Sequence, residues 1–417
     1  MRTDDEAGPP AAVELTLAGP AAGGACVAHR DDATWFVRGG LPGERVMARQ
    51  TGAKGRGRIR FADVVEVLTP SADRVVPPCP AAGRCGGCDL QHVAYGAQLR
   101  WKSQVLADQL QRIGRISTIG SVPVHEAVVV EAVPLPGRPD GLGWRTRLAL
   151  STDEAGRPCF HGRHSDELVA VPGCVVTVPE LQAGFAGRWA PGRRLAWALG
   201  EQGAVVDGEP AGSAAPVAVP GWTVGPTVVR QAAGCSWLGA VGGFWQAHAA
   251  APDVLVDAVR RALAPASGDS VIDLYCGVGL FAGALGAEVG EGGSALAVEG
   301  DRRAARLARR NLADLPQARV VQADVQRWVA KGGSRALATA DVVVLDPPRA
   351  GAGAAVVSAV AAAGRARAVA YVACDGGSLA RDAAMLGQHG WELSGLQAFD
   401  LFGMSHHVEA VATFRRS

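Results

Sequence analysis

Three cysteines lie within ten residues of one another, in the segment Cys79-Pro-Ala-Ala-Gly-Arg-Cys85-Gly-Gly-Cys88. The glycines between the last two let the backbone turn tightly enough for several thiolates to face one point. Cysteines at this spacing are typical of a metal centre, which is either an iron–sulfur cluster or a zinc site.

A second candidate site follows a predicted strand in the C-terminal third, where Gly277 and Gly279 open a helix. Glycines at this position let the backbone approach a ligand at the carboxyl end of the strand. Glu299 closes the next predicted strand, where its carboxylate can accept hydrogen bonds from ribose hydroxyls. Ala282 replaces the third glycine of a dinucleotide fingerprint, and no Lys-Ser/Thr pair follows. The pattern therefore favours a ligand with a ribose but no pyrophosphate, such as S-adenosylmethionine, over a purely structural turn.

Asp324 follows the third predicted strand, where it is placed to meet an adenine amino group. The run Asp346-Pro347-Pro348-Arg349 ends the fourth strand, and Cys374 ends the fifth, so both lie at the edge where open α/β sheets bind ligands. A strand-end cysteine is often a small buried hydrophobe, but this position makes Cys374 the candidate nucleophile. A helix predicted from Ser378 is expected to lower the pKa of the thiol.

Glu409 lies within an apolar strand predicted over Val408–Phe414. Burying a carboxylate there without a role is costly, which predicts a proton acceptor; the alternative is an edge-strand glutamate that faces water. His406 and His407 precede it, but neighbouring strand residues face opposite sides, so we expect no metal pair there.

The elements that position these residues change character along the chain. Residues 13–67 have the short-strand and turn pattern of a small β-barrel, and residues 124–235 are β-rich with many Gly and Pro breaks. From about residue 253, strands alternate with helices, which predicts a doubly wound, Rossmann-like parallel sheet. We therefore expect an α/β protein with domains at 1–70, 71–250 and 251–417. The predicted strands of the last domain are Ser270–Leu274, Ala295–Glu299, Ala318–Gln322, Ala340–Leu345 and Ala368–Ala373.

Composition is that of a soluble globular protein, with 48% hydrophobic and 19% charged residues among 417. The net charge of +1 gives no global attraction to a polyanion, so local patches such as Lys54–Arg58 must supply any phosphate contacts. No signal peptide and no apolar run of transmembrane length is recognisable, which predicts a cytoplasmic protein without a membrane partner. In that compartment clustered cysteines indicate metal binding or catalysis.

In this order, the motifs resemble those of the RNA uridine C5-methyltransferase family, in particular its iron–sulfur-containing 23S ribosomal RNA members. The resemblance covers nearly the whole chain and includes the Phe244-Trp245-Gln246 segment. It implies an N-terminal TRAM-like RNA-binding barrel, a central domain with the iron–sulfur site, and a C-terminal catalytic domain. One departure is Asp375, which stands where the family usually has Asn after the catalytic cysteine.

The resemblance also implies a role for each site residue. Cys374 would be the nucleophile that adds to C6 of uracil, and Glu409 would be the base. The S-adenosylmethionine contacts would be Gln246, Tyr275, Glu299, Asp324 and Asp346. A [4Fe-4S] cluster would be held by Cys79, Cys85, Cys88 and the distant Cys174, with Cys159 as a rival for the fourth position. The expected partner is RNA, with ribosomal RNA preferred to transfer RNA, and the expected state is a monomer. The alternatives are a transfer RNA methyltransferase, a radical enzyme and a non-catalytic RNA-binding protein.

Overall fold

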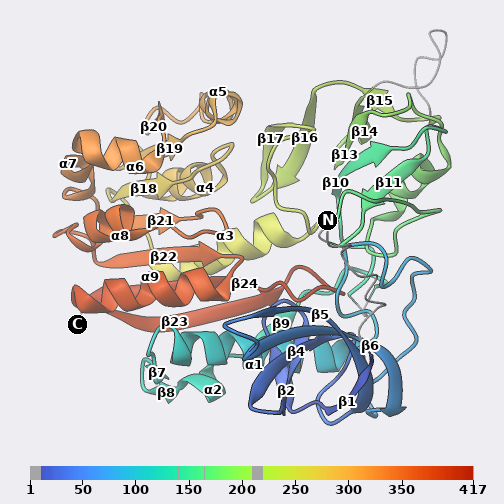
Figure 1. Ribbon diagram of the computed structural model, residues 1–417. Helices are drawn as coiled ribbons and strands as arrows, with labels where there is room; N and C mark the ends of the chain where they lie inside the picture. The colour runs from blue at the N-terminus through green and yellow to red at the C-terminus, as the bar shows by residue number, and fades with distance from the viewer. Residues whose placement is uncertain (1–10, 139–140, 164, 209–218, 417) are drawn as a thin grey trace, which may run out of the picture.

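The computed structural model describes residues 11–138, 141–163, 165–208 and 219–416 (Figure 1). The N-terminal part is a six-stranded sheet in the order β1-β5-β6-β4-β3-β2. Its strands are β1 (Val13–Thr16), β2 (Gly19–Ala21), β3 (Ala25–Arg30), β4 (Ala33–Arg38), β5 (Arg45–Lys54) and β6 (Ile59–Thr69). Alternate residues of β4, including Trp35 and Val37, are buried, as expected of a sheet with one covered face. Strands β1 and β2 are the two edge strands of this order, so closure of the sheet into a barrel stays a prediction.

The cysteine segment 79–88 leads into helix α1 (Tyr95–Arg112), which packs against the C-terminal part of the chain. Short elements follow: β7 (Thr118–Ile119), β8 (Val122–Pro123), α2 (Val124–Ala127) and β9 (Val130–Ala132). Strand β9 pairs in parallel with a strand near the C-terminus. The segment assigned to a central domain at 71–250 thus contributes one strand to the C-terminal sheet, and the domain boundaries stay a prediction.

A second six-stranded sheet, in the order β12-β11-β10-β13-β14-β15, makes the middle of the chain β-rich as predicted. Its strands are β10 (Arg147–Thr152), β11 (Pro158–His161), β12 (Leu168–Ala170), β13 (Arg194–Gly200), β14 (Gly203–Asp207) and β15 (Thr223–Val224), with a 3₁₀ turn at Pro179–Ala186. Its core contains Trp189, Trp197 and Trp222, whose rings pack within about 6 Å of one another. A separate hairpin of β16 (Thr227–Ala232) and β17 (Cys235–Ala240) then leads to the C-terminal part.

The C-terminal sheet has eight strands in the order β20-β19-β18-β21-β22-β24-β23-β9. The strands not yet given are β18 (Ser270–Leu274), β19 (Ser294–Glu299), β20 (Ala318–Gln322), β21 (Val342–Leu345), β22 (Ala368–Ala373), β23 (Trp391–Asp400) and β24 (Glu409–Arg416). The first five strands in the order run parallel, and β24 is antiparallel to β22. This confirms the predicted doubly wound α/β architecture.

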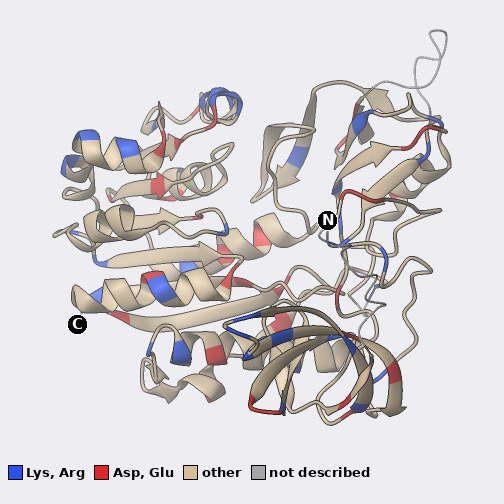
Figure 2. Ribbon diagram, viewed as in Figure 1, with Lys and Arg blue, Asp and Glu red and all other residues tan. Residues whose placement is uncertain are grey.

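Helices cover both faces of this sheet (Figure 1). One face packs on α3 (Ala251–Leu263), α4 (Leu280–Val289) and α5 (Arg302–Asn311), and the other on α1, α8 (Ala354–Ala361) and α9 (Gly376–Gln388). The β20–β21 connection contains α6 (Val325–Trp328), a distorted turn at Val329–Gly333 and α7 (Ser334–Leu337). Basic residues, coloured blue, are concentrated on α5 at the top of Figure 2. No helix of the described residues combines the length and the apolar character needed to cross a membrane.

Candidate active site

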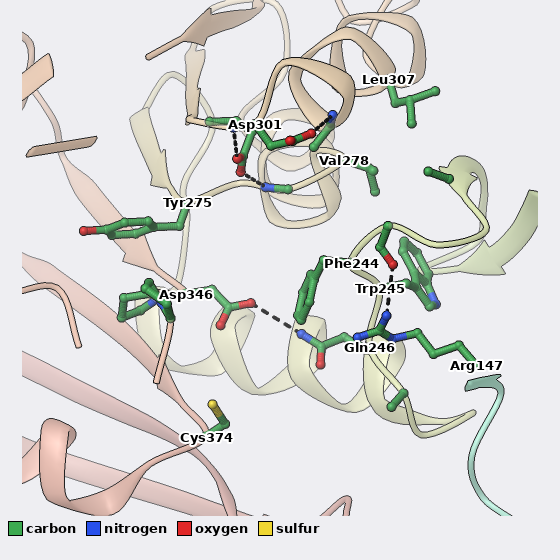
Figure 3. Close-up of a pocket in the computed structure, with 18 of the residues that line it drawn as sticks. Arg147, Phe244, Trp245, Gln246, Tyr275, Val278, Asp301, Leu307, Asp346 and Cys374 are labelled. Atoms are coloured by element: carbon green, nitrogen blue, oxygen red, sulfur yellow. Dashed lines mark hydrogen bonds between the residues drawn. The ribbon is translucent and has the colours of Figure 1, made fainter. Parts of the chain in front are cut away.

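A cavity of about 780 Å³ opens at the carboxyl edge of the parallel strands (Figure 3). Six of the seven residues predicted for catalysis and cofactor binding line it: Gln246, Tyr275, Glu299, Asp346, Cys374 and Glu409. Its volume is within the range of small-molecule sites. Four of them lie at the carboxyl ends of neighbouring parallel strands, Glu409 begins the antiparallel β24, and Gln246 comes from the loop between β17 and α3.

The glycine loop forms one wall of this cavity. The chain leaves β18 through Tyr275, Gly277 and Gly279, which all have positive φ angles, of 66°, 57° and 94°. A Cβ atom on Gly279 would approach Leu312 to 3.2 Å, so the turn requires glycine there for both space and conformation. The fully buried Asp273 accepts a hydrogen bond from the backbone N–H of Ala282 at 2.9 Å and so ties the start of α4 to β18.

Glu299 is held by the backbone on both sides. It accepts hydrogen bonds from the N–H of Gly277 at 2.8 Å and from the N–H of Asp301 at 2.6 Å. Asp301 in turn caps α5 by accepting from the N–H of Ala304 at 2.7 Å, and it also lines the cavity. Sequence reasoning missed Asp301, although an aspartate just before a helix is a recognisable N-cap signal.

Asp324 is the one predicted contact that does not line this cavity. It caps α6, where it accepts a hydrogen bond from the N–H of Arg327 at 3.0 Å. It still acts on the site electrostatically, because burial, followed by Asp324 and Asp382, raises the pKa of Tyr275 to about 12. Its contact with an adenine group stays a prediction.

Cys374 and Glu409 meet because β24 runs antiparallel to β22. The register pairs Ala373 with Ala410. Glu409, the first residue of β24, therefore lies beside Cys374, the residue that follows β22. Glu409 is only 3% exposed, which rules out the alternative of an edge-strand glutamate that faces water. Burial first, and then the charge of Asp346, raise the pKa of Glu409. Burial also raises the pKa of Asp346.

The expectation that a helix N-terminus lowers the pKa of Cys374 is wrong. Burial first, followed by the charges of Glu409 and Asp346, raises this pKa to about 11, while Arg349 acts in the opposite direction. The start of α9 is instead occupied by Asp375, which accepts a hydrogen bond from the N–H of Ser378 at 2.8 Å. Desolvation and two buried carboxyl groups thus determine the direction of the shift.

The two histidines before Glu409 also differ from expectation. They belong to the loop between β23 and β24, not to a strand, and their ring centroids lie 4.1 Å apart. His406 contacts Asp89 through its Nδ1 at 2.5 Å, and His407 contacts Arg349 through its Nε2 at 3.0 Å. Asp89 follows Cys88, so this loop connects the cysteine segment with the active site.

An aromatic segment forms the opposite wall of the cavity (Figure 3). Phe244 is 61% exposed, and the guanidinium of Arg147 lies 5.5 Å from its ring centroid. Two residues after Phe244, the side-chain amide nitrogen of Gln246 donates to the carboxylate of Asp346 over 3.4 Å. An exposed aromatic ring in the cavity that also contains Cys374 is suited to stacking on a planar ligand. Arg147 lines the cavity as well, and no sequence signal distinguished it from the neighbouring Arg145.

A second, smaller cavity is lined by the four cysteines that were predicted to bind a metal: Cys79, Cys85, Cys88 and Cys174. The rival Cys159 does not line it, and its thiol lies 3.3 Å from the carbonyl of Arg157. Burial, together with the other three cysteines, raises the pKa of Cys88 to about 12, which reflects four acidic thiols that share one site. Within the described residues, no three His, Cys, Asp or Glu side chains are arranged to hold a metal ion. The donor set suits an iron–sulfur cluster, but the cluster itself stays a prediction.

Comparison with known proteins identifies the family. No protein-family model matches the chain. An RNA methyltransferase of Streptomyces avermitilis, described as uncharacterized, is 40% identical, over 96% of this chain and 97% of the relative. The 23S rRNA (uracil(1939)-C(5))-methyltransferase of Pseudomonas putida is 32% identical, over 93% of this chain and 90% of the relative. The chain belongs to the RNA uracil C5-methyltransferase family.

A solved structure supports the fold expected of this family. The tRNA (uracil-54, C5)-methyltransferase of Pyrococcus abyssi, in complex with S-adenosyl-L-homocysteine, superposes with a TM-score of 0.70 at 21% identity. The match covers 96% of this chain and 100% of that chain. Membership in the uracil C5-methyltransferase family therefore agrees with both the sequence and the sheet that carries the site.

Proposed function

We propose that this chain transfers a methyl group from S-adenosylmethionine to C5 of a uridine in 23S ribosomal RNA. The observation that carries the proposal is the meeting of Cys374 and Glu409 in one cavity with Asp346. A thiol, a buried carboxyl group and a glycine-turn ligand site are the parts that C5 methylation of uracil requires. Relatives that are 32–33% identical and named for uracil methylation of 23S ribosomal RNA support this substrate class.

The chemistry starts from the weakness of uracil C5 as a nucleophile. Addition of the Cys374 sulfur to C6 forms a C–S bond and moves the ring electrons into an enolate, which makes C5 nucleophilic. When bound, the methyl donor would supply an electrophilic methyl group on a sulfonium; C5 would form a bond to that methyl group as the S–CH3 bond breaks and S-adenosylhomocysteine leaves as a neutral thioether. Glu409 then accepts the proton from C5, and the electrons of that bond expel the Cys374 thiolate. The target uridine must leave its stack to reach the cavity.

The raised pKa of Glu409 suits the last step of this reaction, in which the C5 proton is removed. A buried carboxylate whose pKa is raised, such as Glu409, takes up a proton more readily than an exposed one. The thiol needs the opposite adjustment, because a pKa of about 11 keeps Cys374 protonated at neutral pH. Arg349 lowers that pKa, and a positively charged sulfonium in the cavity would lower it further.

We further propose that Cys79, Cys85, Cys88 and Cys174 hold a [4Fe-4S] cluster with a structural role. The convergence of these four residues on one cavity supports this assignment. The cluster would cross-link two segments far apart in the sequence, and the redox-neutral methyl transfer requires no electron from it.

The decisive experiment uses the Glu409→Gln variant. Glutamine keeps the size of the side chain but cannot take the C5 proton, so methylated RNA should stay bonded to Cys374. We expect a protein–RNA adduct that survives denaturing electrophoresis and is absent from the Cys374→Ala/Glu409→Gln double variant. Normal turnover in Glu409→Gln would exclude Glu409 as the base, and Asp375 would become the next candidate.

Mapping of 5-methyluridine identifies the substrate. RNA from cells without the gene should lack the modification at one site of 23S ribosomal RNA, and the wild-type gene but not Cys374→Ala should restore it. Loss of 5-methyluridine from transfer RNA alone would instead assign the activity to transfer RNA.

A further inference from the structure

Helix α5 presents a row of arginines beside the active-site cavity. Five of its ten residues are arginine: Arg302, Arg303, Arg306, Arg309 and Arg310. At 3.6 residues per turn they fall within an arc of about 120° around the helix axis. The opposite arc contains the buried residues Ala305, Leu307 and Ala308. In Figure 2 this helix shows a dense group of basic residues.

None of these five arginines has an acidic partner among the residues that the structure describes. Arg303 donates a hydrogen bond to the carbonyl of Pro226 and thereby joins α5 to the chain before β16. Arg302, Arg306, Arg309 and Arg310, here called the arginine stripe, are exposed and form no ion pair within the part of the chain that the structure describes.

The arrangement is unfavourable for the helix itself. Arg306 lies three or four positions from each other member of the stripe, and like charges at these spacings repel one another. Arg302 occupies the first turn, where the positive end of the helix dipole disfavours a cation, whereas Arg309 and Arg310 occupy the last turn, where the dipole favours one. Stability of the isolated fold therefore does not account for the stripe, whereas a bound polyanion would neutralise it.

The position of α5 connects the stripe with the active site. Arg303, Ala304 and Leu307 of the same helix line the cavity that contains Cys374. At the other end, the amide of Asn311 donates to the carbonyls of Leu238 at 3.1 Å and Val278 at 3.0 Å. The helix is thus fixed to β17 and to the glycine loop, so its outer face has a defined place beside the cavity mouth.

We propose that the arginine stripe binds backbone phosphates of the RNA strand that flanks the target uridine. The proposal rests on the proposed function. The stripe spans about 12 Å at 1.5 Å per residue, which is long enough to contact several successive phosphates of one strand. Guanidinium groups bind phosphate oxygens in a bidentate manner. An anionic membrane fits less well, because the apolar side chains of α5 are buried and none is available to insert.

The test compares RNA binding by three double variants over a range of salt concentrations. The probe is a 23S ribosomal RNA fragment transcribed in vitro. R306Q/R310Q should bind it about tenfold more weakly at low salt, and the slope of log K against log salt should decrease by about two. R306K/R310K keeps both charges and should keep most of the slope. The matched control R112Q/R335Q removes two exposed helical arginines away from α5 and should bind like the wild type.

Binding of S-adenosylhomocysteine by calorimetry shows whether each variant retains its fold and ligand cavity. Equal RNA affinity and equal salt slope for R306Q/R310Q and the wild type would overturn the proposal, as would an equal loss in R112Q/R335Q. Loss of binding to phosphatidylserine vesicles without loss of RNA binding would assign the stripe to a membrane instead. If the wild type neither binds nor methylates RNA, the proposed function fails; if it does both and R306Q/R310Q is unchanged, only the stripe assignment fails.

Discussion

At the scale of single residues, the site is defined by where side chains are buried rather than by their types. Cys374 and Glu409 lie 35 positions apart in sequence and meet only because β22 and β24 pair. That pairing places the Glu409 carboxyl group beside the Cys374 thiol, and the pairing of β21 with β22 adds Asp346 from the other side. The protein therefore favours the neutral form of Cys374, the proposed nucleophile, and the charge of Arg349 favours the thiolate.

This environment predicts how Cys374 reacts with iodoacetamide. Because burial and acidic neighbours raise its pKa to about 11, alkylation of wild-type Cys374 should keep accelerating up to about pH 11. Glu409→Gln removes one negative charge, so the pKa should fall and alkylation at pH 8 should be several-fold faster. Mass spectrometry of the modified peptides measures both rates. The exposed Cys235 serves as internal control, and an unchanged rate at Cys374 would contradict this account of its pKa.

Sequence reasoning predicted most of the residues that meet in this cavity because strand ends are recognisable. Glu299, Asp346 and Cys374 each close a strand, and parallel strands bring such positions to one edge. What it missed depends on tertiary structure. Arg147 belongs to a different sheet and reaches the cavity only through packing, and the pKa of Cys374 depends on burial that no local pattern encodes.

At the scale of elements, the loop between β23 and β24 positions Glu409, the proposed base. Lys102 of α1 and Asp400 at the end of β23 are 1% and 2% exposed, and their charged atoms lie 2.5 Å apart. The Lys102 ammonium also donates to the carbonyl of Phe402 at 3.2 Å. The backbone of Met404 is held by Gln98 and by the N–H groups of Asp89 and Leu90. The loop that leads to Glu409 is thus fixed by α1 and by the cysteine segment.

The buried ion pair predicts a clear asymmetry between single and double variants. Lys102→Met leaves the Asp400 carboxylate buried without a partner, so the free energy of unfolding should fall by about 3–5 kcal/mol. Lys102→Met/Asp400→Leu removes both charges and should recover much of that loss. Urea denaturation, followed by tryptophan fluorescence, measures these changes. The idea fails if Lys102→Met is as stable as the wild type, or if the double variant is less stable than Lys102→Met.

At the scale of the whole molecule, sequence reasoning predicted the C-terminal sheet well and the connections between parts poorly. Three predicted strands, including Ser270–Leu274 and Ala368–Ala373, have the bounds found in the structure. Hydrophobic runs between helices are a strong local signal. By contrast, β9 joins the sheet from a segment over 100 residues away, and its three residues carry no signal of that pairing. Long-range pairing of short strands depends on the assembled fold.

The four-cysteine cavity is the clearest long-range connection, since Cys174 lies 86 positions after Cys88. If a [4Fe-4S] cluster joins them, protein purified without oxygen should be brown and contain about four iron atoms per chain. Cys174→Ser should reduce the iron content sharply and make the segment around residues 79–88 more accessible to limited proteolysis. Cys159→Ser is the matched control, because Cys159 is buried outside the cavity. The Cys159→Ser variant should contain as much iron as the wild type. One zinc per chain without iron would exclude the cluster. Full iron content in Cys174→Ser would instead exclude Cys174 as the fourth ligand while leaving the cluster in place.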